Sequence, residues 1–339
     1  MFDYSRQLRP DEAQVHLLDH EGHPGFPAVR EQIAAAARAY GFTLTAAASL
    51  DPWPADPPIT GHRLLLVLAS GPFDQPLVDT LLTDGLRRYS IISIAFRYRD
   101  EGEMRSYAEL VDKYKRLAED RINFLRPCPL PGGELVVPPT KLVDNAICDS
   151  VRIKYRPVNL DPAPIALDAG LAAFFTRASD LFEQHRLYHR SASDGYFAAR
   201  TPGDPGFYIT ATKSYKDPLD LRRVVRVERY DEADNTLRFR GAYLPSSDAV
   251  EASIVFARNP EVASVVHTHA STWFTRNPRF RERVLVGRER YGEPRLGHLV
   301  HQALDGVEDG FVIMEDHGEV FAHNAPEVSP TLLSHLPRP

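Results

Sequence analysis

The chain has 339 residues, of which 43% are apolar and 25% charged, a composition that supports well-packed cores and a length that favours two domains. Its net charge of −6 is spread along the sequence without a basic run, which argues against nucleic acid and favours small diffusible substrates as partners. No apolar run is long enough to span a bilayer, the first residues lack a signal-peptide pattern, and two cysteines cannot form a disulfide framework, so we expect a cytoplasmic protein without membrane contact.

The first half of the chain alternates between helical and strand patterns. In chain order, the pattern predicts a helix over 26–40, strands over 42–48 and 63–69, a helix over 76–88, a strand over 90–97 and a long amphipathic helix over 104–121. Such alternation is typical of a parallel sheet covered by helices, so we expect a smaller α/β domain of flavodoxin-like arrangement. The turn at 69–73 has neither a G-x-G-x-x-G nor a Walker pattern, and no role is assigned to this domain.

Proline-rich stretches at 127–139 and 157–164 follow, and prolines at this density break helices and central strands. The second stretch predicts the boundary between an α/β domain over 1–163 and a catalytic domain over 164–339. The elements predicted in the second domain are a helix over 167–190, strands over 195–200, 206–211, 224–230 and 236–240, a short helix from Ser247, a strand ending at His267, a helix over 295–304 and a strand over 310–314.

Two histidines, His267 and His269, follow a mostly apolar, β-branched run over 261–266 that predicts a buried strand. Side chains at i and i+2 of a strand point to one face with Cα atoms about 6.6 Å apart. Both imidazoles can then bind one divalent cation at about 2.0–2.1 Å. In a helix, side chains at i and i+2 point in different directions around the axis and could not bind one cation in this way. A bare His-x-His is more often two ordinary histidines at a strand end, so the interpretation depends on the surrounding motifs.

Two further motifs flank this strand. The segment Pro245-Ser246-Ser247-Asp248 ends 19 residues before His267, and a strand-ending His317-Gly318 follows 50 residues after it. In order and spacing, the three motifs resemble the class II aldolase/adducin family of metal-dependent sugar-phosphate aldolases, epimerases and dehydratases. The resemblance extends over 167–323, roughly the second half of the chain.

The resemblance implies an α/β/α domain with a central, mainly antiparallel sheet. Its metal ligands would be His267, His269 and His317, with Zn2+ as the expected metal and Fe2+ or Mn2+ as alternatives. Asp248 would take the family's acidic position and act as acid/base once substrate displaces it from the metal. Helix capping is the structural alternative for Asp248, and both roles can hold together. A metal bound in this way would stabilise the enediolate left when a neighbouring C–C bond breaks.

The family's phosphate pocket is only partly kept. Ser246 and Ser247 keep its paired serines, and Thr212 matches its turn threonine. The family's asparagine is replaced by Tyr196, which fills much of the space of the amide, and the expected glycine by Lys213. The lysine adds a cation that can hold phosphate or carboxylate as a point charge. We therefore expect an anionic substrate, with a carboxylate or a bulkier aromatic acid as candidates beside a sugar phosphate.

Two more residues are weaker candidates. Glu251 is either a second carboxylate of the site or a solvated helix residue. Tyr291 follows the His-x-His segment, where aldolases use a tyrosine or acid from a neighbouring subunit, and its alternative is an ordinary turn residue. Because family members are commonly tetramers, the resemblance implies a homo-oligomer, with a tetramer expected.

Three functions stay open. The leading one is a metal-dependent lyase acting on a small anionic hydroxy-carbonyl or keto-acid substrate, whose intermediate an epimerase or decarboxylase would share. The second is an Fe(II)-dependent oxygenase or decarboxylase of secondary metabolism on the same fold, because three histidines with open positions also suit Fe(II). The third is a non-catalytic adducin-like module. Metal analysis with an oxygen-uptake assay separates the first two, and retention of all ligands argues against the third.

Overall fold

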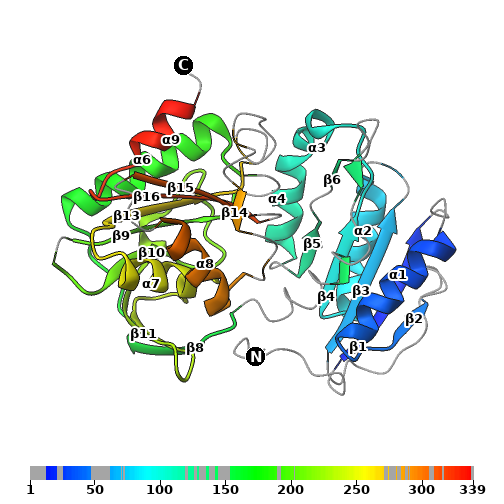
Figure 1. Ribbon diagram of the computed structural model, residues 1–339. Helices are drawn as coiled ribbons and strands as arrows, with labels where there is room; N and C mark the ends of the chain where they lie inside the picture. Colours follow the sequence, from blue (N-terminus) through cyan, green and yellow to red (C-terminus); the bar gives the residue numbers. More distant parts are fainter. Residues whose placement is uncertain are drawn as a thin grey trace. The chain divides into compact units, whose positions relative to one another are not determined.

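The computed structural model divides the chain into two compact units, Met1–Arg152 and Ile153–Pro339. Each has its own sheet and buried core, and each is described by itself (Figure 1). None of the helices that the structure describes combines the length and apolar character needed to cross a membrane. The structure describes residues 13–20, 26–46, 62–69, 71, 73–118, 121–125, 128–129, 135–136, 142–143, 153–188, 192–201, 203–270, 274, 280, 284–286, 289, 291–304, 309–314 and 317–336.

The N-terminal unit contains a five-stranded parallel sheet in the order β2-β1-β3-β4-β5. This is the strand order of flavodoxin-like sheets, and it confirms the predicted α/β domain. Its strands are β1 (Ala13–His20), β2 (Leu44–Ala46), β3 (His62–Ala69), β4 (Ile91–Ala95) and β5 (Ile122–Phe124), followed by the short antiparallel pair β6 (Cys128–Pro129) and β7 (Leu135–Val136). Its helices are α1 (Phe26–Ala39), α2 (Gln75–Thr83), η2 (Gly85–Arg87), α3 (Glu101–Ser106) and α4 (Ala108–Leu117).

Strand β3 shows why this sheet is apolar at successive positions. Leu65 and Val67 pack in a core with α2 and α4, whereas Leu64 and Leu66 pack in a second core with α1. Alternate residues of a strand point to opposite faces, and a parallel sheet covered on both faces needs apolar side chains on each. The continuous apolar run of β3 therefore follows from burial on both faces.

One predicted helix of this unit is wrong in extent. The helix expected over 104–121 is divided into α3 and α4 at Tyr107, whose φ of −98° and ψ of 2° leave helical geometry. The Tyr107 ring instead stacks on Phe73 at 5.4 Å between centroids, a contact that contributes about 0.5–1.5 kcal/mol. Strands β1 and β5 have no counterpart among the predicted elements, although β1 lies between β2 and β3 in the sheet.

The described strands of the C-terminal unit form a nine-stranded sheet in the order β14-β15-β16-β13-β9-β10-β11-β12-β8. Neighbours are antiparallel except in the two edge pairs, which confirms the predicted mainly antiparallel sheet. The strands are β8 (Arg156–Asp161), β9 (Tyr196–Ala199), β10 (Phe207–Thr210), β11 (Val224–Asp231), β12 (Thr236–Arg240), β13 (Ser264–Thr268), β14 (Val284–Val286), β15 (Asp309–Met314) and β16 (Gly318–His323). The helices are α6 (Ala169–His185), η3 (Leu221–Arg223), α7 (Ala249–Arg258), α8 (Pro294–Leu304) and α9 (Pro330–His335).

Helices lie on both sides of this sheet. α6 and α9 pack against Phe197 of β9 and Val266 of β13 in a core rich in phenylalanine. α7 and α8 lie together on the other side of the strands (Figure 1). Because side chains alternate along a strand, Tyr196 and His267 point to the face opposite Phe197 and Val266. The candidate site therefore lies on the side of the sheet that α7 and α8 cover.

The boundary between the units lies earlier than the sequence predicts. The stretch 157–164 contains most of β8, which pairs in parallel with β12 at the edge of the C-terminal sheet. Pro157 is tolerated there because an edge strand does not need every N–H in the ladder. The predicted limits of 1–163 and 164–339 assign this strand to the first domain, whereas the structure joins it to the second.

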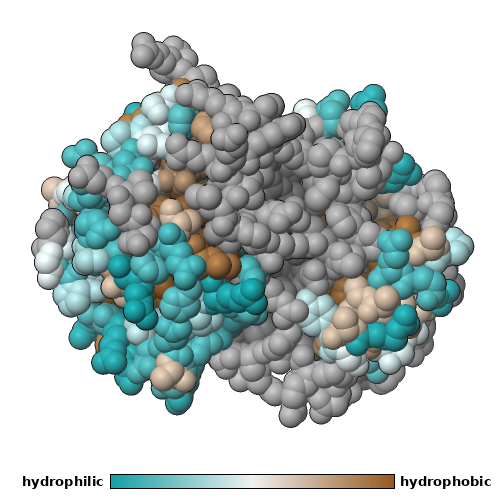
Figure 2. All heavy atoms as spheres, in the orientation of Figure 1, coloured by the Kyte–Doolittle hydropathy of each residue, from teal (hydrophilic) through white to brown (hydrophobic). Residues whose placement is uncertain are grey.

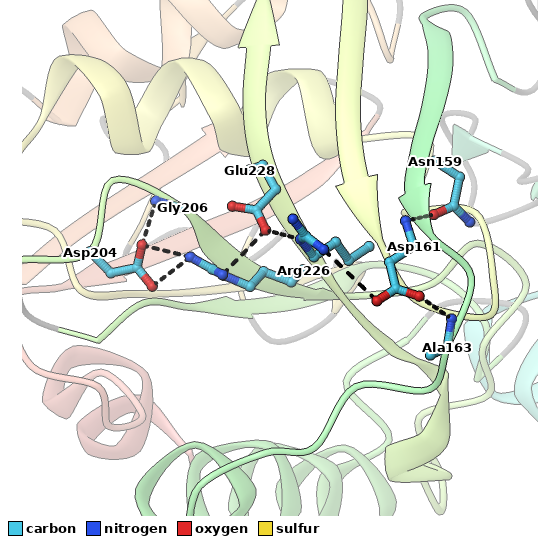
Figure 3. Close-up of polar contacts among 8 residues, drawn as sticks. Asn159, Asp161, Ala163, Asp204, Gly206, Arg226 and Glu228 are labelled. Carbon is cyan, nitrogen blue, oxygen red and sulfur yellow. Dashed lines mark hydrogen bonds and ion pairs between the residues drawn. The ribbon is translucent and has the colours of Figure 1, made fainter.

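A series of ion pairs connects β8 with its neighbours (Figure 3). Arg226 on β11 lies 3.0 Å from Asp204 and 3.2 Å from Glu228, measured between charged atoms. Arg240 on β12 lies 2.7 Å from Glu228 and 3.8 Å from Asp161 of β8. The side chains are partly exposed, so each pair contributes at most about 1 kcal/mol. Figure 2 shows mainly hydrophilic side chains over the end of this unit where β8 and β11 lie.

Candidate metal centre

Strand β13 carries the first histidine into the middle of the sheet. It lies between β16 and β9, and His267 is completely buried. His269 follows directly after the strand, where its N–H donates to the carbonyl of Leu187 at 3.1 Å. The two rings are 4.7 Å apart between centroids, and their Nε2 atoms are 3.1 Å apart. The two imidazoles therefore converge on one place.

His317 comes from the turn between β15 and β16. Because β16 is antiparallel to β13, this turn lies beside the end of β13. The His317 ring lies 5.1 Å from that of His267 and 5.4 Å from that of His269. One ligand nitrogen from each of the three residues lies within 4.8 Å of the other two. The structure thus brings together the three residues that the resemblance implies as metal ligands.

Two glycines allow this close approach. At Gly318 the backbone φ is +155°, and an added Cβ would lie 2.2 Å from the carbonyl oxygen of Thr268 and 3.0 Å from Cε1 of His267. At Gly195 the φ is +74°, and an added Cβ would lie 2.2 Å from the carbonyl oxygen of His267. Such separations are far inside van der Waals contact, so any side chain would push the strands apart. The glycine of the His-Gly motif is therefore required sterically.

Groups of β16 fix the orientation of His267. Its Nδ1 donates to the carbonyl oxygen of Glu319 at 2.9 Å, which leaves the lone pair on Nε2. The buried Glu319 carboxylate accepts from the Thr268 hydroxyl at 2.7 Å and from the Ala270 N–H at 2.8 Å. Burial lowers the pKa of His267 to about 4. The imidazole is therefore neutral near pH 7, which is the form that binds metal.

This donor set fits a divalent transition metal. Two nitrogens bound to a tetrahedral ion at about 2.0–2.1 Å lie about 3.3 Å apart, close to the 3.1 Å between the Nε2 atoms of His267 and His269. Imidazole suits Zn2+ and Fe2+ better than Mg2+ or Ca2+. Three protein ligands leave a coordination position for a reactant, as in catalytic zinc sites. Within the part of the chain that the structure describes, no other group of His, Cys, Asp and Glu side chains is arranged in this way.

Asp248, the predicted acidic residue, is buried at the start of α7. Its side chain makes no capping hydrogen bond, so helix capping does not occupy the carboxylate. The Asp248 N–H instead donates to Oγ of Ser246 at 3.3 Å. Burial, and after it the charges of Glu251 and Asp248, raise the pKa of Tyr196 well above its ordinary value. Asp248 therefore lies in the electrostatic neighbourhood of Tyr196, which is next to His267.

Tyr196 and Glu251 form a buried pair beside the histidines. Tyr196 stands opposite His267 in the pairing of β9 with β13, and their ring centroids are 5.2 Å apart. The Tyr196 hydroxyl donates to Oε1 of Glu251 at 2.9 Å. Both side chains are completely buried, so the alternative of Glu251 as a solvated helix residue is wrong. Burial, with the charge of Asp248, raises the pKa of Glu251 to about 8.

The predicted anion-binding residues come from two adjacent turns. The Thr212 N–H, just after β10, donates to the carbonyl of Leu244 at 2.9 Å, which places this turn beside the one that carries Ser246 and Ser247. Lys213 has a φ of +60°, a left-handed conformation that glycine adopts most readily. The lysine thus keeps the backbone shape expected of the family's glycine while adding a cation.

Tyr291 also lies beside the three histidines. Its ring packs edge-on against His317 with centroids 6.0 Å apart. The ammonium of Lys154 lies 4.3 Å from the centre of the Tyr291 ring and donates to its carbonyl. The next residue, Gly292, lies against the carbonyl oxygen of Ser247. Tyr291 therefore reaches the centre within its own chain, and Lys154 adds a cation that no sequence motif predicts.

Other supporting residues have weak signals in the sequence. Tyr155 donates from its buried hydroxyl to the carbonyl of Pro245 at 2.9 Å and so holds the turn before α7. The buried ammonium of Lys216 donates to the carbonyls of Ser193 and Ser214, each at 2.9 Å. Lys216 thereby joins the loop before β9 to the loop after β10. Tyr155 precedes the predicted boundary and Lys216 belongs to no motif, so neither could be found from the pattern.

A family model matches part of the second half of the chain. Residues 176–329 match the family described as Class II Aldolase and Adducin N-terminal domain, a range that includes all three histidines. No curated protein matches the chain. Three similar solved structures are YgbL from Escherichia coli (22% identity, 46% of this chain and 78% of that one, TM-score 0.36), L-fuculose-1-phosphate aldolase from Thermus thermophilus (20%, 46% and 80%, 0.35) and an aldolase II superfamily protein from Pseudomonas syringae (18%, 50% and 72%, 0.39).

Proposed function

Because residues 176–329 match the class II aldolase and adducin family, we propose that the protein is a metal-dependent lyase. It would cleave or form a carbon–carbon bond next to a carbonyl group of a small anionic substrate. The observation that supports this most is the convergence of His267, His269 and His317, whose ligand nitrogens lie within 4.8 Å of one another. A bound divalent cation, Zn2+ in this proposal, supplies Lewis acidity toward the carbonyl oxygen.

Asp248 is the proposed acid/base. Its carboxylate is buried, is not used as a helix cap and lies near Tyr196, the neighbour of His267. A carboxylate in this place can take a proton from the reactant in one direction and return it in the other. General acid–base catalysis of this kind contributes about 10²–10⁴ in rate.

Tyr291 is the proposed second proton-transfer residue, on the His317 side of the cluster. Lys154 contacts both the ring and the carbonyl of Tyr291 and so holds the side chain against His317. Lys213, on the turn after β10, and Lys154, beside Tyr291, would supply positive charge near the site. Point charges of this kind suit a carboxylate, which supports a hydroxy acid or keto acid as the substrate class.

The proposal is tested by purifying the protein without oxygen, measuring its metal content and assaying a panel of hydroxy-carbonyl and keto-acid compounds. We expect about one bound metal ion per chain and release of a carbonyl product without oxygen uptake. Bound iron with substrate-dependent oxygen uptake would support the Fe(II) oxygenase instead. Absence of both metal and turnover would favour the adducin-like module.

Assembly and location remain predictions. A homotetramer is proposed from the family alone, and light scattering over a range of concentrations would test it. A concentration-independent monomer would contradict it and would agree with the placement of Tyr291 at the histidines of its own chain. The cytoplasmic location is likewise an expectation from the sequence.

A further inference from the structure

Tyr196 occupies the position that carries an amide donor in the family that this domain resembles. It stands directly opposite His267 on the neighbouring strand, and the two rings are 5.2 Å apart. Cross-strand neighbours on one face contact each other, so a ligand bound at the histidines would lie close to Tyr196. The hydrogen-bonding groups around Tyr196 therefore help to determine which substrate can bind.

The single O–H of Tyr196 is already used. It donates to Oε1 of Glu251 at 2.9 Å, and both side chains are completely buried. A phenol has one proton to donate, so Tyr196 cannot offer it to a phosphate oxygen while this bond is kept. The phenol hydrogen-bonds a carboxyl group, which carries at most one proton of its own. A phosphate dianion placed here would meet more acceptor oxygens than donors and would lose much of its hydration without replacement.

The second carboxyl oxygen of Glu251 indicates which kind of ligand group binds beside Tyr196. Oε2 has no hydrogen-bond partner among the described residues, although it is shielded from solvent. A buried polar atom without a hydrogen-bond partner costs free energy. A hydroxyl group of a ligand would satisfy Oε2 in either protonation state of Glu251, because a hydroxyl can donate to an ionised carboxylate and accept from a protonated carboxyl group. The raised pKa of Glu251, about 8, further lowers the charge that such a ligand would meet at neutral pH.

We propose that Glu251 is a specificity residue, which forms a hydrogen bond with a hydroxyl group of the substrate and, together with Tyr196, disfavours a phosphate ester on this side of the metal centre. The proposal rests on the proposed function, because the substrate is taken to bind at the three histidines. It narrows the substrate class to hydroxy-carbonyl compounds or hydroxylated keto acids that carry no phosphate.

The experiment measures binding of hydroxamates, which chelate the metal, to the full-length zinc-loaded protein by calorimetry. The probes are alkyl hydroxamates of two to four carbons, the same compounds with a terminal hydroxyl, and the phosphate esters of the latter. For at least one chain length we expect the hydroxyl compound to bind about tenfold more tightly than the alkyl compound, and the phosphate ester at least about tenfold more weakly than the hydroxyl compound. Equal binding of hydroxyl and alkyl probes, or tightest binding of the phosphate ester, would overturn the proposal.

Two variants assign the effect to Glu251. Glu251→Met keeps a side chain of similar length but no acceptor, and it should bring the hydroxyl-to-alkyl ratio to about one while alkyl binding is kept. Tyr196→Phe keeps the ring beside His267 and the carboxyl group of Glu251, so the ratio should persist. Loss of the ratio in Tyr196→Phe alone would contradict the assignment. Alkyl binding and circular dichroism show in each variant that the centre and the fold are intact.

The two proposals fail in different ways. If the wild-type protein binds no alkyl hydroxamate and no zinc, the metal centre itself is refuted, and the specificity proposal falls with it. If alkyl hydroxamates bind but the hydroxyl group adds nothing, only the role of Glu251 is refuted.

Discussion

The two units bury different kinds of side chain. In the described part of the N-terminal unit, both faces of β3 pack in apolar cores, and few buried residues are polar, namely Ser90, Ser93, Lys115 and Asn123. The C-terminal unit buries ionisable groups around its sheet, among them Arg200, Lys216, Asp248, Glu251, His267 and Glu319. Burying such groups costs free energy unless partners or ligands compensate. Among the described residues, the buried ionisable groups that a chemical site needs are therefore concentrated in the second sheet.

The largest expected effect comes from removing a metal ligand. His269→Ala should abolish metal binding and lower kcat/KM by at least about a thousandfold, or about 4 kcal/mol, because the Lewis acid is lost. The matched change in the other unit is His16→Ala, which breaks a hydrogen bond of 2.9 Å to the Tyr89 hydroxyl. It should leave metal content and activity unchanged.

Elemental analysis and steady-state kinetics on both variants check this contrast. Full metal content in His269→Ala would refute the proposed metal site at the three histidines. A loss of activity in His16→Ala without unfolding would show that the N-terminal unit takes part in the chemistry.

The next effect concerns backbone geometry. Gly318→Ala should lower the free energy of unfolding by about 3 kcal/mol, because the added Cβ meets the carbonyl oxygen of Thr268 and the backbone is strained. Gly203→Ala also has a positive φ, of +83°, but open space around it, so only the strain remains, about 1 kcal/mol. Gly71→Ala, in the N-terminal unit, has neither problem and should be close to neutral.

Urea unfolding of the three glycine variants separates the clash from the strain. Equal losses at Gly318 and Gly203 would mean that strand β16 can move away from β13, and that the close approach at the histidines is not rigid.

The contrast between the units also explains what the sequence could predict. The apolar run of β3 and the alternation of helices and strands are local patterns, so the class of the N-terminal sheet followed from them. The histidines followed from motif spacing, because His267 and His317 lie at the same end of the antiparallel pairing of β13 with β16. Edge strand β8 could not be predicted, since its prolines resemble a linker and its pairing with β12 is distant in sequence.

The unpredicted residues of the site share one property. Lys154 contacts Tyr291 across 137 positions of sequence, and Tyr155 contacts Pro245 across 90. Such contacts depend on tertiary packing that no local periodicity records. Glu251 could be named from its place in α7, but its full burial could not, because a glutamate on a helix is ordinarily exposed.

A smaller effect is expected in the pH dependence of stability. Native Glu251 keeps its proton up to about pH 8, whereas the unfolded chain releases it near the ordinary pKa of 4.5. The native state therefore binds more protons between these values, and the free energy of unfolding falls as pH rises. His267 acts in the opposite direction between about pH 4 and 6.5, so the window from pH 6.5 to 8 isolates Glu251.

In that window the metal-free protein should lose about 2 kcal/mol of stability. Glu251→Gln, which cannot titrate, should show no such loss. Urea unfolding at several pH values checks this, and an equal slope in both proteins would mean that Glu251 is already ionised at neutral pH.

The smallest effect tests whether the buried polar groups act on the metal centre or only on the fold. The Thr268 hydroxyl donates to Oε2 of Glu319 at 2.7 Å, and the Glu319 carbonyl in turn orients His267. Thr268→Val keeps the shape of the side chain and removes this donor, at a cost of about 1 kcal/mol in stability. Because the Ala270 N–H still holds the carboxylate, Glu319 should shift rather than swing away.

Zinc affinity separates the two roles, because outer partners of a ligating histidine typically change affinity by about 10–100-fold when removed. We expect a loss near the lower limit in Thr268→Val, measured by competition with a chelator, and none in Thr268→Ser, which keeps the hydroxyl. A stability loss with unchanged affinity would show that Glu319 supports only the strand pairing. The buried polar groups of the C-terminal unit would then include some that stabilise its fold without acting on the metal centre.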